Sequence, residues 1–341
     1  MICSPMKNKI IFLTASLFLT ACTAAGIEAQ FPPSRIDLYV IDVSKSIVGD
    51  PQNPSSELFS RVENRIKADI ANNALGSPAL ASGTRKIEAK PALGLYVQMM
   101  GDRASDNRPE QIRTPEGSLE LWNIVKEMDL NEGNLSDLWA KIQEISGQVL
   151  NSGEQTQCKE RAFDSLEGQS GTATKHQEIS SLICQETVGS LTRIEEFNTK
   201  LSDFLQETSG TPGSDIYQTI KNTHSWISTI KDNQIDNFNF NFIILSDMVH
   251  DADSEKDLNR LIPQLSKTEI VEVAVKDARE LGISFSGLNT KVFIVGLGAF
   301  GPNYETKANF VSSLQDYWTA YFEELGINAN FTPTLDDVRL G

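Results

Sequence analysis

The chain has 341 residues, of which 40% are hydrophobic and 22% are charged, so it can bury a substantial core and is not a disordered chain. This length accommodates one large domain or two modest ones. The formal net charge of −16 disfavours nucleic acid and anionic membrane surfaces as partners.

The first 21 residues have the parts of a secretory signal. Lys7 and Lys9 precede an apolar run over residues 10–19, which is too short to span a bilayer as a permanent helix. The segment Leu-Thr-Ala-Cys that ends at Cys22 resembles the lipobox of bacterial lipoproteins. The resemblance implies that signal peptide 1–21 is removed and that Cys22 is lipidated. An ordinary cleaved signal with an incidental cysteine is the alternative.

Thr23, and not Asp, follows Cys22, and in bacterial lipoproteins this favours the outer membrane. We therefore expect a protein anchored in the cell envelope that faces the periplasm, with residues 22–34 as a short polar tether. An exported compartment is oxidising, so we expect Cys158 and Cys184 to form a disulfide, with two free thiols as the alternative. These two cysteines have no histidines at ligand spacing, which argues against a zinc site.

Strands and helices alternate along the rest of the chain. Branched, apolar runs predict buried strands at residues 36–42, 91–100, 238–245 and 291–297. Apolar residues at helical spacing predict helices at about 55–75, 191–205, 216–230, 255–281 and 304–325. The order predicts an α/β fold with a mainly parallel central sheet, covered by helices on both faces. A helix break is expected at Pro263.

The block from about residue 101 to 190 has a different character. It contains two predicted helices, near 118–128 and 134–149, and a Gln-, Ser- and Gly-rich excursion at 152–176 that is expected to be flexible or dominated by loops. Because the block is far longer than a typical loop, we interpret it as a mostly helical insertion in a domain that covers residues 35–325. The tail, residues 326–341, is expected to be loosely held.

A group of oxygen-bearing side chains follows the first predicted strand. Residues two apart in an extended segment point the same way, so Asp42, Ser44 and Ser46 offer one carboxylate and two hydroxyls to one point past the strand end. Such ligands suit a hard divalent cation, Mg²⁺, Mn²⁺ or Ca²⁺. Asp-x-Ser-x-Ser after an apolar first strand resembles the metal-ion-dependent adhesion site of the von Willebrand factor type A family, which has a Rossmann-like α/β fold.

Two downstream segments extend this resemblance. Residues 213–216, Gly-Ser-Asp-Ile, match the family's threonine-bearing loop with Ser214 in the threonine position, and Thr211 is an alternative ligand. Asp247 follows the strand at 238–245 and matches the family's aspartate, but Met248 stands where the family has glycine.

The resemblance implies a role for each of these residues. Ser44, Ser46 and Ser214 would bind the cation directly, and Asp42 and Asp247 would bind it directly or through water. Mg²⁺ is the expected ion, because hydroxyls, waters and few carboxylates satisfy it. A coordination position would remain for an acidic side chain of a protein partner.

Other interpretations of these residues stay open. Asp and Ser at strand ends also cap helices and fill turns. The run that contains His250, Asp251 and Asp253 is expected to be a solvated loop and not a second metal site. The main expectation is a non-enzymatic, lipid-anchored binding protein. The alternatives are a metal-dependent phosphoester hydrolase with Asp42 as phosphoryl acceptor, although Ser44 stands where such enzymes carry a second Asp, and a structural envelope protein with a vestigial site.

Overall fold

The computed structural model describes residues 29–30, 34–44, 55–73, 79–80, 93–101, 108–113, 116–128, 130, 132–152, 157–208, 213–233, 238–251, 256–297 and 308–340. The predicted signal peptide, the predicted lipidation site Cys22, and the candidate ligands Ser46 and Thr211 lie outside the described residues. No helix in these ranges combines the length and apolar character needed to cross a bilayer.

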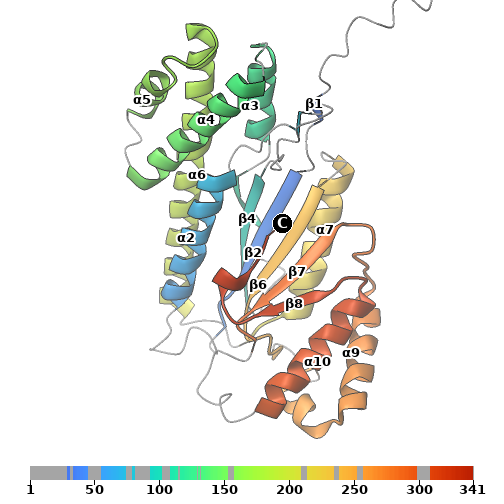
Figure 1. Cartoon of the computed structure of the whole chain (residues 1–341). Helices are drawn as coiled ribbons and strands as arrows, with labels where there is room; N and C mark the ends of the chain where they lie inside the picture. The colour runs from blue at the N-terminus through green and yellow to red at the C-terminus, as the bar shows by residue number, and fades with distance from the viewer. Residues whose placement is uncertain are drawn as a thin grey trace, which may run out of the picture.

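A six-stranded sheet forms the centre of the molecule (Figure 1). Its strands in spatial order are β5 (Glu110–Arg113), β4 (Leu93–Met100), β2 (Ser34–Asp42), β6 (Phe238–Leu245), β7 (Thr290–Val295) and β8 (Ala329–Thr332). Neighbours pair in parallel except β4 and β5, which pair antiparallel. Counted along the chain, this order is that of a doubly wound sheet, with the first strand in the middle.

Helices cover both faces of the sheet (Figure 1). On one side, α2 (Ser55–Asn73) and α6 (Ala173–Thr208) lie against the sheet. α3 (Glu116–Lys126), α4 (Glu132–Ser152) and α5 (Cys158–Ser165) pack against α6 and extend beyond the end of the sheet (Figure 1). The other side contains α7 (Ile216–Asn233), α8 (Leu258–Leu261), α9 (Lys267–Leu281) and α10 (Ala308–Glu324). The predicted α/β class with a mainly parallel, two-sided sheet is confirmed.

The side chains of β2 explain why the second half of the strand, residues 38–41, is a continuous apolar run. Tyr39 and Ile41 pack into the core on the α2 side, and Leu38 and Val40 pack into the core on the α7 side. Alternate residues of a strand point to opposite faces, so a central strand that is covered twice must be apolar at both sets of positions.

Some shorter elements lie outside the six-stranded sheet. A small antiparallel pair joins β1 (Ala29–Gln30), within the predicted tether, to β3 (Ala79–Leu80). The predicted break at Pro263 is confirmed, since α8 gives way there to the 3₁₀ turn η1 (Ile262–Gln264) before α9 begins.

The excursion expected to be flexible at 152–176 is largely helical where it is described. Residues 158–165 form α5, and α6 begins at residue 173 and continues unbroken past residue 190, where the insertion is predicted to end. Ala162 and Leu166 within this segment are buried in the core on the α2 side, so tertiary packing stabilises a segment whose polar composition indicates a loop.

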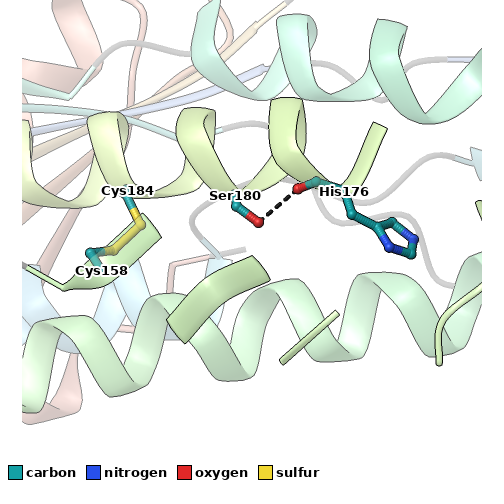
Figure 2. Close-up of a disulfide and its surroundings, with 4 residues drawn as sticks. All are labelled: Cys158, His176, Ser180 and Cys184. Atoms are coloured by element: carbon teal, nitrogen blue, oxygen red, sulfur yellow. Dashed lines mark hydrogen bonds between the residues drawn. A yellow bond between two sulfur atoms is a disulfide. The ribbon is translucent and has the colours of Figure 1, made fainter. Parts of the chain in front are cut away.

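The predicted disulfide between Cys158 and Cys184 is confirmed. It joins α5 to α6 with a Cα–Cα distance of 5.8 Å (Figure 2). One turn earlier on α6, the Ser180 hydroxyl donates a hydrogen bond of 2.7 Å to the carbonyl of His176 (Figure 2).

The expectation of a loosely held tail after residue 326 is wrong. Residues 329–332 form β8, which pairs in parallel with β7 at the edge of the sheet. The 3₁₀ turn η2 (Leu335–Asp337) then brings Leu335 and Val338 into the core on the α2 side. Arg65 of α2 donates to the carbonyls of both residues, at 3.5 Å and 3.2 Å, which ties the C-terminal segment to the first helix layer.

Candidate functional site

The candidate site lies where the connections of the sheet diverge. The next strand of this sheet along the chain, β4, lies on one side of β2, and β6 lies on the other. At such a switch point the carboxyl ends of the two central strands open a crevice for ligands. Asp42 is the last residue of β2, and Ser246 and Asp247 come directly after β6. Because Ile41 is in register with Leu245, Asp42 lies beside Ser246.

The Asp42 carboxylate is the centre of a hydrogen-bonded cluster. The Ser214 hydroxyl lies within donating distance of both carboxylate oxygens, at 2.8 Å and 2.9 Å. The Ser246 hydroxyl donates to Oδ2 at 2.6 Å, and the backbone N–H of Ser44 donates to Oδ1 at 2.9 Å. Side chains from the ends of β2 and β6 and from the loop before α7 therefore meet at one buried point.

Several residues predicted for this site converge here. Ser214 reaches Asp42 across 172 positions of the chain, and Ser44 lies next to it in the same turn. Asp247 is fully buried just past β6, and its Oδ1 accepts the N–H of Val249 at 3.0 Å. Asp42 ends β2 and Asp247 follows the end of β6 by two residues, so both predicted carboxylates belong to the carboxyl edge of the sheet.

Ser246 is a member of the cluster that the sequence analysis does not predict. It donates to Asp42 and also accepts the N–H of Met248 at 2.8 Å, so it links the end of β2 to the turn after β6. The sequence signal for it is its position directly before Asp247, at the end of a predicted buried strand. The position of Ser246 points to this role only when β2 and β6 are known to be adjacent. The Ser246 hydroxyl then lies next to Asp42 at the end of β2.

Met248, the residue after Asp247, adopts a backbone conformation that glycine favours. Its φ is +61°, in the left-handed region that L-residues rarely adopt. The Met248 side chain is completely buried, and its carbonyl accepts the indole N–H of Trp318 at 2.9 Å. Packing and this hydrogen bond therefore hold the turn after Asp247 in a strained conformation.

The segment expected to be a solvated loop supports the site. His250 is buried, and its Nδ1 accepts the N–H of Ile216, the first residue of α7, at 3.3 Å. Asp251 is exposed, but its carboxylate accepts the N–H of Ser214 at 2.8 Å. Both residues fix the loop that presents Ser214. The expectation of a solvated loop is wrong for His250, which is buried, whereas Asp251 is exposed as expected. Asp253 lies outside the described residues.

The carboxylates of the site are in an environment that disfavours their charge. Burial raises the pKa of Asp42, and the hydrogen bonds from Ser246, Ser44 and Ser214 only partly oppose this effect. The pKa of Asp251 is also raised, first by burial and then by the nearby charge of Asp42. A positive charge placed between such groups would favour their ionised forms.

Within the described ranges, no three side chains of the types His, Cys, Asp and Glu are grouped so that they could hold a metal ion. The predicted ligand set contains two carboxylates, and its other members are serine hydroxyls. No protein-family model matches the chain, and no curated protein matches it. Function is therefore inferred from the residues at the carboxyl edge of the sheet.

Proposed function

We propose that this chain is a lipid-anchored cell-envelope protein of the von Willebrand factor type A kind, which uses a divalent cation to bind an acidic side chain of a protein partner. The observation that carries the proposal is the contact between the Ser214 hydroxyl and the Asp42 carboxylate. These two residues belong to separate predicted motifs, and they meet at the switch point of a doubly wound sheet.

The donor set fits a hard cation. Asp42 is completely buried, and among the residues that the structure describes the groups that most lower its pKa are serine hydroxyls and a backbone N–H. Ser44, Ser214 and Asp42, together with Asp247 and Ser46, would hold the ion. Oxygen ligands of this kind suit Mg²⁺ best, and Mn²⁺ or Ca²⁺ less closely.

The small number of carboxylates explains the choice of partner. With few negative ligands, the bound ion keeps enough positive charge to accept a carboxylate from outside. The role of this chain's residues is to orient their oxygens and to keep Asp42 ionised. This favours a binding function over a catalytic one, and an acidic protein side chain over nucleic acid.

The proposed anchor and the proposed site belong to opposite ends of β2. The predicted tether leads from Cys22 into the amino end of β2, whereas Asp42 is at its carboxyl end. At about 3.3 Å per residue, the nine-residue strand separates the two ends by roughly 26 Å. The site would therefore face away from the outer membrane, toward partners in the periplasm.

Titration calorimetry of the mature chain with MgCl₂ tests the metal site. We expect Asp42→Asn and Ser214→Ala each to weaken Mg²⁺ binding at least about tenfold, which is about 1.4 kcal/mol. Ser225→Ala is the matched control, because Ser225 is an exposed serine on α7 that donates to the carbonyl of Lys221 within its own helix. Equal affinity in all four proteins would contradict the proposal.

A pull-down from envelope extracts tests the binding function. The wild-type chain is expected to retain a partner in MgCl₂ and to lose it in EDTA, and Asp42→Asn is expected to retain none in either condition. A partner that stays bound in EDTA would show that binding does not depend on the cation.

A further inference from the structure

Arg113, the last residue of β5, belongs to the edge strand of the sheet and not to the candidate metal site, and it is completely buried. Its Nε, Nη1 and Nη2 atoms have no hydrogen-bond partner in the part of the chain that the structure describes. A guanidinium carries five N–H donors. Leaving them all unsatisfied in a buried position is strongly unfavourable, so a group that accepts these bonds is expected at this place.

The charges around Arg113 do not balance. Burial lowers the pKa of Arg113 to about 10, so the side chain is still charged at pH 7. Glu186 of α6 is the carboxylate that opposes this effect, and Arg193 adds a second positive charge nearby. Arg193 itself donates to the carbonyl of Ile112 at 3.1 Å, one residue before Arg113.

The first turn of α3 borders the same place. α3 begins three residues after Arg113, and a Cβ added at Gly117 in its first turn would overlap the side chain of Glu186. Glu186 therefore lies close to both Arg113 and the start of α3. The first N–H groups of an 11-residue helix have no partner within the helix and carry partial positive charge.

We propose that a small monovalent inorganic anion, chloride in particular, binds between β5, the first turn of α3 and α6, with Arg113 as its main ligand. Among the side chains that the structure describes at this place, two arginines and a helix N-terminus face one carboxylate, so one added negative charge brings the group close to neutrality. The complete burial of Arg113 selects a small ion over an acidic peptide. Glu186 is half-buried, so part of its side chain is in contact with solvent.

Thermal unfolding of the mature chain in sodium chloride and in sodium gluconate, at equal ionic strength, tests this site. We expect the Tm to be higher in chloride by about 3 °C. Arg113→Met should remove the difference, and the matched control Arg161→Met, an exposed arginine on α5, should keep it. An additional series in sodium phosphate distinguishes a chloride site from one that prefers a larger anion.

Direct detection keeps the test decisive if Arg113→Met does not fold. Crystals of the wild-type chain grown in sodium bromide should show an anomalous peak within hydrogen-bonding distance of the Arg113 guanidinium. The proposal is overturned if the wild type has the same Tm in both salts, if the shift persists in Arg113→Met, or if the crystals show Glu186 paired with Arg113 and no bromide there. Phosphate also stabilises proteins in general, so the site is read from the part of each shift that Arg113→Met loses. A larger loss in phosphate than in chloride would overturn the assignment to a small monovalent ion.

Discussion

Asp37 shows how a single buried residue makes the stability of this protein depend on pH. It lies in the middle of β2 with no exposed surface, and its carboxylate accepts hydrogen bonds from Arg35 at 2.8 Å and from Asn241 at 2.6 Å. The charge of Arg35 alone would lower the pKa of Asp37. Burial is the larger effect and raises this pKa from 3.8 to about 6.

Because its pKa is higher in the folded state, Asp37 stabilises the fold most at low pH. This contribution is complete below about pH 4 and is lost as the pH rises through 6. Between pH 4.5 and 7.5 the free energy of unfolding should fall by about 2 kcal/mol from this group. In urea unfolding, the free energy of unfolding should depend less on pH in Asp37→Asn than in the wild type. The exposed control Asp164→Asn should have the wild-type pH dependence. If Asp37→Asn had the same pH dependence as the wild type, another group would be responsible for it.

Met248 combines backbone strain with a packed side chain, and the two effects can be separated by substitution. Met248→Gly should relieve the strain of the φ of +61°, by about 1 kcal/mol, and should leave a cavity that costs roughly 2–5 kcal/mol. We therefore expect a net loss of stability in urea unfolding. Asn289→Gly is the control, since Asn289 has a φ of +43° and is exposed, and should change stability less. A more stable Met248→Gly protein would mean that strain is the larger effect.

At the scale of elements, the disulfide fixes α5 to the long helix α6. α5 has only eight residues, and such a short helix is not stable by itself in water. Cys158 and Cys184 lie 26 positions apart, so their bond closes a loop that holds α5 and the start of α6 together. The strands of the sheet pair outside this loop.

Replacing both cysteines by serine should therefore act locally first. We expect a loss of roughly 3 kcal/mol in the free energy of unfolding, from the larger conformational freedom of the unfolded chain. Amide hydrogen exchange should become faster in α5 and stay slow in β2 and β6. Fast exchange throughout the sheet would show instead that the insertion and the sheet unfold as one unit.

At the scale of the whole molecule, the C-terminal segment contacts two distant parts of the fold, the edge of the sheet and α2. β8 covers the edge of β7, and η2 places Leu335 and Val338 against α2, far away in sequence. Arg65 reinforces this contact from α2, and it also pairs with Asp69 at 3.3 Å. The last element of the chain and one of its first helices therefore stabilise each other.

Truncation of the chain tests how much these C-terminal contacts stabilise the fold. A chain that ends at Gly326 should lose cooperative thermal unfolding, because it exposes the edge of β7 and removes three core residues, Ile327, Leu335 and Val338. A chain that ends at Arg339 keeps β8 and all three core residues, and should unfold within a few degrees of the full protein. Circular dichroism melts compare the two. A cooperative melt of the shorter chain near the wild-type Tm would show that the C-terminal segment is dispensable.

The sequence by itself determined the strands that are buried on both faces of the sheet. β2, β6 and β7 are covered on both faces, so their runs are largely apolar and can be recognised without tertiary information. The resemblance to the motifs of the von Willebrand factor type A family also predicted that Ser214 lies near Asp42, and the two side chains are in contact. The cysteine pair followed from the oxidising compartment expected for an exported chain.

Only the tertiary structure decided the features that depend on neighbours distant in sequence. β5 and β8 are short edge strands with mixed polar sequences, and they exist because β4 and β7 offer free edges to pair with. The length of α6 comes from packing against the core, and the role of Ser246 comes from the register of β2 with β6. Local propensity cannot encode such contacts, because their free energy arises from groups that folding alone brings together.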